Sequence, residues 1–170
     1  MTQHAQQEPR EKSVPAGAEL DLPRYFPYRL ARLAEQVSLA VAAVYAKRFS
    51  LSRHEWRILA VLGTREVLPT KEIGRLTTLD KMNVSRAVRS LEARGVVTRI
   101  CDPKDKRERI VALTAAGRAL YRKMVPQALE REAFLLAALT PQEAAALDAA
   151  IEKLGRAAAR AAGEDGVGRL

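Results

Sequence analysis

The residues best suited to chemistry lie along one face of a predicted helix over residues 81–94. This face presents Lys81, Met82, Asn83, Ser85, Arg86, Arg89 and Ser90. Arginine can donate two hydrogen bonds to guanine, asparagine can pair with adenine, and serine or lysine can contact phosphate oxygens. The face carries no acidic side chain before Glu92, whereas a solvated helix face usually mixes both signs. The pattern predicts a helix that contacts DNA, and the alternative is an ordinary solvated basic face.

Positive charge is concentrated around that helix. The 170-residue chain has 29 Lys and Arg residues against 20 Asp and Glu residues, which gives a net charge of +9. Residues 81–109 hold nine basic and four acidic residues, so this segment carries +5 of the surplus. Such a concentration predicts a polyanionic partner, and nucleic acid is favoured over an anionic membrane.

Catalytic and metal-binding chemistry finds no support in the residue types. The chain has two histidines, His4 and His54, and one cysteine, Cys101, without metal-ligand spacing. It shows neither a glycine-rich phosphate loop nor a triad-like arrangement, so we expect no enzyme activity, no metal and no cofactor. A single cysteine fits a reducing compartment, and we expect Cys101 to pack in the core rather than sense redox state. No apolar run is long enough for a bilayer span, so we expect a cytoplasmic protein without a membrane partner.

Two predicted helices and a tight turn must hold the polar face in place. The helix over residues 81–94 has apolar residues at the spacing of one buried stripe, namely Val84, Ala87, Val88 and Leu91. Gly95 is expected to end it. A capping box of Ser52 and Glu55 predicts an earlier helix that ends at Gly63, and Thr70 is expected to cap a short helix between the two.

A β-hairpin is predicted directly after this helix. The β-branched runs 96–100 and 109–113 flank a charged turn sequence over residues 102–108. The turn contains three basic residues, Lys104, Lys106 and Arg107. The sequence therefore predicts a hairpin with a basic tip beside the DNA-contacting helix.

Long helices are predicted at both ends of this segment. One covers residues 29–47; a second begins after Thr114 and could run to Ala138, with a kink expected at Pro126. A third begins at Thr140-Pro141-Gln142-Glu143 and carries apolar residues on one face, including Leu147, Ile151 and Leu154. Their apolar faces exceed what a small domain can cover, so we expect dimerisation rather than a purely intramolecular core.

In this order and spacing, the segments resemble the MarR family of winged helix-turn-helix transcriptional regulators. The resemblance extends over roughly residues 30–154 and rests on five segments: Leu51-Ser52 with Trp56-Arg57-Ile58-Leu59, Ile73-Gly74-Arg75-Leu76, residues 83–99, the wing Asp102-Pro103-Lys104-Asp105-Lys106-Arg107, and Leu113-Thr114-Ala115-Ala116-Gly117. The wing departs from the family's Asp-x-Arg-Asp-x-Arg pattern, because Lys104 and Lys106 stand where arginine is typical. Lysine lacks the planar fork of arginine, so softer wing contacts are expected.

The resemblance implies a fold and an assembly. The fold would be mainly α (α+β winged helix-turn-helix), with six helices and a two-stranded β-hairpin wing. It implies an intertwined helical homodimer on a pseudo-palindromic operator, with half-sites about one DNA turn apart, roughly 10 bp. It also implies repression of transcription and a minor-groove contact by the wing tip, for which Lys106 and Arg107 are the candidates.

We divide the chain accordingly into five segments. These are a disordered leader (1–22), an N-terminal dimerisation helix (23–50), a DNA-binding lobe (51–113), C-terminal dimerisation helices (114–162) and a tail (163–170).

The resemblance further implies a small-molecule effector between the dimer helices and the DNA-binding lobe. The candidate ligand-binding residues are Tyr25, Phe26, Tyr28, Arg29, Arg32 and His54. Arg29 and Arg32 share a helix face, so they could clamp a carboxylate, and the aromatic residues could enclose a ring. We therefore expect an aromatic carboxylate, or its coenzyme A thioester, as effector. The alternative is that these residues pack an interface or face solvent.

Three other functions stay open from the sequence. They are a nonspecific architectural DNA-binding protein, a regulator that is insensitive to ligands, and a dimeric module whose winged domain binds protein. The polar residues of the 81–94 helix are suited to base contacts. They therefore favour a sequence-specific regulator over an architectural protein and over a module that binds protein.

Overall fold

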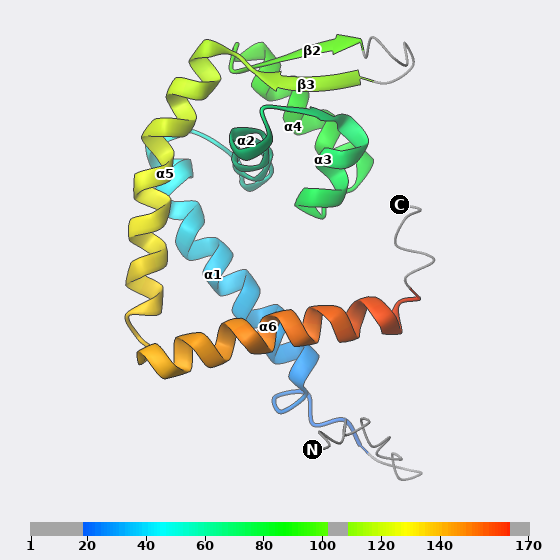
Figure 1. Cartoon of the computed structure of the whole chain (residues 1–170), viewed down its shortest axis with the longest axis vertical. Coiled ribbons are helices and arrows are strands. Elements are labelled where there is room, and N and C mark those ends of the chain that lie inside the picture. Colours follow the sequence, from blue (N-terminus) through cyan, green and yellow to red (C-terminus); the bar gives the residue numbers. More distant parts are fainter. Residues whose placement is uncertain (1–18, 102–108, 164–170) are drawn as a thin grey trace, which may run out of the picture. The chain divides into compact units, whose positions relative to one another are not determined.

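The computed structural model describes residues 19–101 and 109–163, which form six helices and three strands (Figure 1). The elements in chain order are α1 (Phe26–Phe49), α2 (Arg53–Arg65), β1 (Val67–Pro69), α3 (Thr70–Thr77), α4 (Lys81–Ala93), β2 (Val97–Cys101), β3 (Arg109–Leu113), α5 (Ala115–Leu136) and α6 (Pro141–Ala161). The predicted mainly helical winged helix-turn-helix with six helices is confirmed. Most of the predicted leader and tail lies outside the described residues.

The chain forms two compact units, residues 1–37 and residues 38–170. The first contains the N-terminal part of α1, in which every described residue is exposed. The second contains the remaining elements and the hydrophobic core. The core centres on α2, whose Ile58, Leu59 and Leu62 are fully buried, and α2 packs against α3, α4, α5 and β3.

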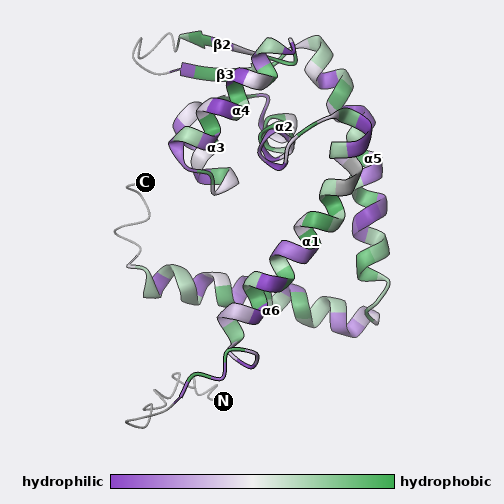
Figure 2. Cartoon of the chain, turned by 180° about the vertical axis from the view of Figure 1, so that it is seen from behind, coloured by the Kyte–Doolittle hydropathy of each residue, from purple (hydrophilic) through white to green (hydrophobic). Residues whose placement is uncertain are grey.

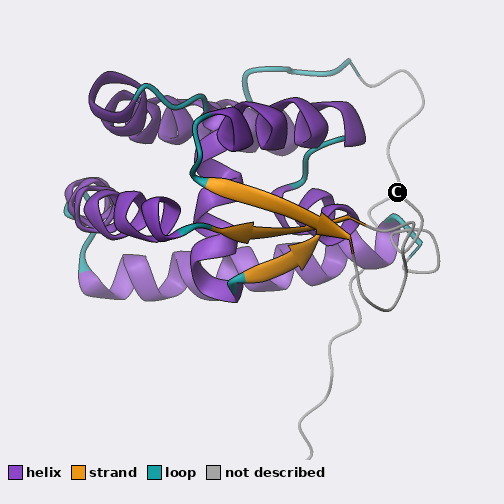
Figure 3. Ribbon diagram, turned by 90° about the horizontal axis from the view of Figure 1, so that it is seen from above, coloured by secondary structure: helices purple, strands orange, loops and turns teal. Residues whose placement is uncertain are grey.

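The three strands form an antiparallel sheet in the order β1-β3-β2, and they lie side by side in Figure 3. Strands β2 and β3 are the predicted hairpin, with Ile100 opposite Ile110 and Val97 opposite Leu113. Strand β1 was not predicted, because it has three residues and ends in Pro69, which usually argues against a strand. It occupies the sheet edge, where a missing N–H does not interrupt the ladder.

Local capping signals define several helix ends as predicted. Both capping boxes form, Ser52 with Glu55 at α2 and Thr140 with Glu143 at α6, and Thr114 caps α5. The predicted Thr70 cap of α3 is wrong, because the Thr70 hydroxyl donates instead to the carbonyl oxygen of Arg109 on β3 at 2.9 Å.

The predicted end of α2 at Gly63 is also wrong, since the helix continues to Arg65. A Cβ atom at position 63 would lie 2.3 Å from the Tyr121 ring of α5. Gly63 therefore allows α2 and α5 to approach closely, and the turn falls instead at Glu66, which adopts a positive φ of 59°. Helix α5 runs through Pro126 to Leu136.

Helix α6 differs from the core helices, because none of its described residues is buried. Its apolar residues Leu147, Ile151 and Leu154 are 41%, 57% and 43% exposed. Figure 2 shows hydrophobic and hydrophilic residues alternating along this helix. Within the described ranges, no single helix has the length and apolarity to cross a bilayer; α5 and α6 together pass that test, but they are bent by 109° at their junction.

Candidate nucleic-acid interface

Helix α4 presents its polar face because its apolar face is completely buried. Val84, Ala87, Val88 and Leu91 are each at most 6% exposed, as the sequence predicts. The opposite face carries exposed Lys81, Met82, Arg86, Arg89 and Ser90, with Asn83 and Ser85 half-buried at its edges. The core thus fixes the rotation of α4 about its own axis, and this rotation turns two arginines three residues apart toward solvent.

A tight turn connects α3 to α4. The backbone N–H groups of Thr78 and Leu79 both donate to the carbonyl oxygen of Gly74, and Thr78 adopts a left-handed conformation. The side-chain oxygen of Asp80 then caps α4 by accepting from the Asn83 backbone N–H at 2.8 Å. This arrangement of two helices around a short turn is the helix-turn-helix predicted from the sequence.

The Asp80 carboxylate also holds the Asn83 side chain, whose Nδ2 donates to Oδ2 at 2.6 Å. The Asn83 backbone N–H is the main cause that lowers the pKa of Asp80, so the cap stays ionised. The amide oxygen of Asn83 and its second N–H remain available for a base edge. The sequence analysis does not predict this cap, although aspartate is among the preferred residues at a helix N-cap.

Ser90 is tied to the core through a buried carboxylate on α2. Its hydroxyl donates to Oε1 of Glu55 at 2.6 Å, while Oε2 accepts from the Ser52 backbone N–H at 2.6 Å. Burial opposes ionisation of Glu55, but the hydrogen bonds from Ser90 and Ser52 and the charge of Arg94 outweigh it and lower the pKa. The structure therefore places Ser90 as a link between α4 and α2.

Three of the basic residues counted in the sequence interact within the chain, namely Arg94, Arg99 and Arg109. Arg94 follows α4 and donates to the carbonyl oxygens of Phe49 at 2.8 Å and Ser50 at 3.0 Å, at the end of α1. Arg99 on β2 pairs with Glu92 on α4. By contrast, Lys81, Arg86 and Arg89 are exposed and form no hydrogen bond or ion pair with another described residue.

The wing strands extend the same surface. Arg99 on β2, Arg109 on β3 and Glu92 on α4 line a polar hollow. The predicted tip residues Lys104, Lys106 and Arg107 lie outside the described residues.

Cys101 is exposed and its sulfur accepts from the Arg109 guanidinium, so its predicted packing role is wrong. A hairpin position near the end of β2 has no second layer to cover it.

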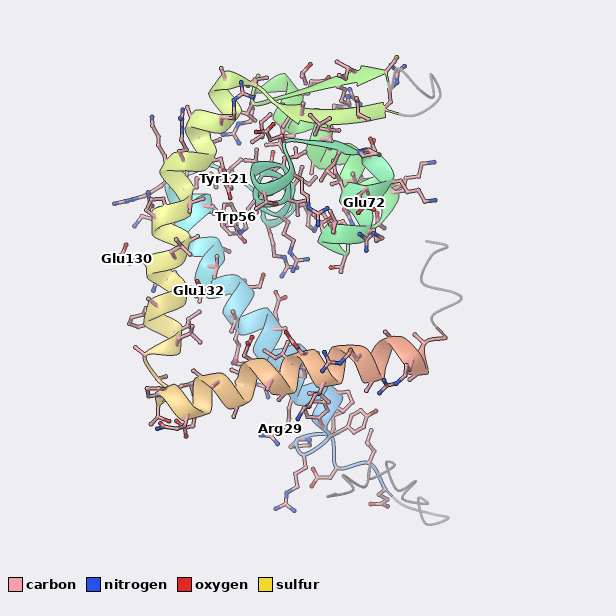
Figure 4. The ribbon with its side chains drawn as sticks, viewed as in Figure 1. Arg29, Trp56, Glu72, Tyr121, Glu130 and Glu132 are labelled. Carbon is pink, nitrogen blue, oxygen red and sulfur yellow. The ribbon has the colours of Figure 1, made fainter. Side chains whose placement is uncertain are left out.

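The candidate ligand-binding residues divide between the two units. Tyr25, Phe26 and Tyr28 are 37–49% exposed, and the Arg32 guanidinium lies 5.8 Å from the centre of the Tyr28 ring. Arg29, labelled in Figure 4, is exposed on the same helix. His54 belongs to the second unit, as the second residue of α2. Among the described residues, no cluster of His, Cys, Asp and Glu could hold a metal ion.

The chain matches known proteins over most of this fold. The sequence profile described as MarR family matches residues 51–109. YkoM, an uncharacterized HTH-type transcriptional regulator of Bacillus subtilis (strain 168), is 31% identical over 110 residues, which cover 65% of this chain and 71% of YkoM.

Solved structures extend the likeness to the whole fold. A MarR-family transcriptional regulator from Silicibacter pomeroyi is 30% identical, with a TM-score of 0.67 over 81% of this chain and 94% of that one. BpsR of Bordetella bronchiseptica has a TM-score of 0.73 at 22% identity, over 81% of this chain and 98% of its own. The DNA binding of BpsR is regulated by 6-hydroxynicotinic acid. The likeness to BpsR concerns the fold.

Proposed function

Since the chain belongs to the MarR family, whose members are transcriptional regulators and not enzymes, we propose that it represses transcription by binding a specific operator as a homodimer in the cytoplasm. The observation that carries the proposal is the pair Arg86 and Arg89. Both are exposed on the helix that follows the tight turn, and they lie opposite a completely buried apolar face. A helix held in this way can enter the major groove with both guanidinium groups directed at base edges.

Each residue of the interface has a proposed task. Arg86 and Arg89 read guanine, Asn83 reads a base at the start of α4, and Lys81 and Ser85 contact phosphates. Ser90 holds α4 on α2 through Glu55. Lys104, Lys106 and Arg107 of the wing tip contact the backbone or the adjacent minor groove. Base contacts provide specificity, whereas the lysines and the wing provide affinity that depends on salt.

The homodimer is supported by apolar surface that the described chain leaves uncovered. Leu147, Ile151 and Leu154 lie on one face of α6, and each is more than 40% exposed. In the first unit, Leu30 and Leu33 on α1 are 45% and 52% exposed. Contiguous exposed apolar faces on long helices are typical of oligomer interfaces. A two-fold dimer would also present two copies of α4 to two half-sites.

Selection of bound sequences from a library of random DNA duplexes tests the proposal. We expect an inverted repeat whose half-sites are separated by about one DNA turn, roughly 10 bp centre to centre. Repeating the selection with Arg86→Ala and Arg89→Ala should relax the preference at distinct base pairs. Recovery of sequences without a common motif would favour an architectural DNA-binding protein.

For the effector we propose an aromatic carboxylate or its coenzyme A thioester. The proposal rests on Arg29 and Arg32, which are three residues apart on one helix face beside the exposed rings of Tyr25, Phe26 and Tyr28. An effector that binds one dimer conformation better would shift the population away from the DNA-binding form. A hundredfold loss of operator affinity requires about 2.7 kcal/mol of differential binding, which is an ordinary coupling energy.

Titration of the protein–operator complex with hydroxybenzoic and hydroxyphenylacetic acids and their thioesters tests this second proposal. The corresponding neutral amides are the matched controls, because they keep the ring and lose the carboxylate. We expect release of DNA by an acid, and weaker release from Arg29→Ala and Arg32→Ala. If no compound of the panel releases DNA, the protein is a regulator that these ligands do not control.

A further inference from the structure

Met82 is an apolar residue on the polar face of α4. Its side chain is 61% exposed, whereas the other large apolar residues of this helix, Val84, Val88 and Leu91, are at most 1% exposed. Met82 lies four residues before Arg86 and seven before Arg89, so the three side chains share one helix face. Neither the core nor the DNA contacts proposed above give Met82 a task.

The position of Met82 in the helix is as informative as its exposure. It is the second residue of α4, two positions after the capping residue Asp80. In helix-turn-helix proteins the N-terminal residues of the second helix are those that contact base edges. The core does not require methionine here, because a residue exposed to this extent adds little to folding. A long, flexible and apolar side chain is thus placed where the helix meets the bases.

We propose that Met82 reads thymine through the C5-methyl group. In the major groove this methyl is the apolar feature that separates thymine from the other bases, and side chains recognise it by apolar contact. The unbranched methionine side chain can adjust its shape to a single methyl group. Met82 then adds specificity for thymine beside the hydrogen bonds that Arg86 and Arg89 make to guanine. This inference rests on the proposed function, since it needs α4 in the major groove.

The expected effect follows from the size of one methyl group. Removing a buried methyl(ene) from an apolar contact lowers the binding constant by about fourfold. A dimer makes the contact once in each half-site, so removal of both methyls should weaken binding by about fifteenfold.

Deoxyuridine provides the probe, because it lacks only the C5-methyl of thymine. In the duplex selected by the wild-type protein, each symmetry-related pair of thymines is replaced by deoxyuridine, and the dissociation constants of the wild type and Met82→Ala are measured. We expect one pair at which replacement weakens DNA binding by the wild type about fifteenfold and DNA binding by Met82→Ala less than twofold. Met82→Leu keeps an apolar contact and should retain most of the sensitivity.

The controls separate the inference from the proposed function. Val67→Ala removes apolar surface of similar exposure from β1 (Val67 is 47% exposed) and should keep the wild-type sensitivity. Alanine and leucine both favour helix, so both Met82 variants should unfold at the urea concentration of the wild type. If Met82→Ala responds to deoxyuridine like the wild type at every position, the inference is wrong while the proposed function stands. If the selection yields no common motif, both fail.

Discussion

Helices α4 and α6 have similar apolar patterns but different surroundings. The four apolar residues of the α4 stripe are buried within the chain, whereas Leu147, Ile151 and Leu154 of α6 are exposed. The polar face of α4 is therefore oriented by its own chain. We expect a second chain to cover the apolar face of α6, since exposed apolar stripes of this length are unfavourable in water. One protomer thus orients the DNA-contacting helix, and we expect the dimer to set the distance between two such helices.

The largest expected effect is on α6. Ile151→Glu introduces a charge into the proposed interface, once from each protomer. Each site would lose about 1.5–3 kcal/mol of apolar burial energy, so the dissociation constant of the dimer should rise by two or more orders of magnitude. Sedimentation velocity over a range of concentrations measures the change. Ala149→Glu adds the same charge on the opposite side of α6 and should leave the dimer intact. Equal dissociation constants for the two variants would rule out this face as the interface.

The next effect concerns the core side of α4. Leu91 is fully buried, so Leu91→Ala should lower the free energy of unfolding by about 2–5 kcal/mol. Urea denaturation measures this change at a fixed protein concentration, because the proposed dimerisation would make stability depend on concentration. Met82→Ala in the same helix removes an exposed side chain and should change stability by less than about 0.5 kcal/mol. Similar losses for both variants would mean that burial does not distinguish the two faces of α4.

The polar side of α4 should affect recognition but not stability. Arg86→Ala or Arg89→Ala should reduce the discrimination between operator and scrambled DNA by about 1–3 kcal/mol. Lys123→Ala removes the same charge from an exposed position on α5 and should change both affinities little. Fluorescence anisotropy with labelled duplexes gives the dissociation constants of the wild type and of each variant for operator and for scrambled DNA. An unchanged ratio for both arginine variants would assign base recognition to another element.

The smallest effect lies at the junction of α4 and α2. The folded-state pKa of Glu55 is lowered, so its carboxylate stabilises the native state above the unfolded-state pKa of about 4.3. This contribution is lost as pH falls through the lower folded-state pKa. Glu55→Gln should therefore cost about 1–2 kcal/mol at neutral pH, and the difference from the wild type should shrink in acid.

Urea denaturation as a function of pH measures this contribution. Glu130→Gln, at an exposed position on α5, is the matched control and should follow the wild type throughout. A deficit of Glu55→Gln that stays constant down to strongly acidic pH would show that the charge of Glu55 contributes nothing.

The sequence predicted the elements whose signals are local. The capping boxes at Ser52 and Thr140, the buried stripe of α4 and the hairpin strands all follow from residues within a few positions of each other. The same locality explains why the sequence predicts α4 and the orientation of its polar face.

The features that escaped prediction depend on residues far apart in the chain. Strand β1 exists because Leu68 pairs with Val111, and Gly63 stays helical because it faces Tyr121. Serine is a residue type that often contacts DNA phosphates, yet the hydroxyl of Ser90 donates to Glu55, which lies 35 positions earlier. A capping glutamate has two oxygens, and only its tertiary surroundings decide where the second one bonds.

The most direct test of sequence-specific binding is fluorescence anisotropy at physiological salt, with the selected operator and a scrambled duplex of equal length. A dimer that reads bases with α4 should prefer the operator by roughly a thousandfold or more, and Arg86→Ala should reduce this preference. Near-equal affinities for the two duplexes that fall together as salt is raised would contradict sequence-specific binding by α4, because charge alone would then account for the binding.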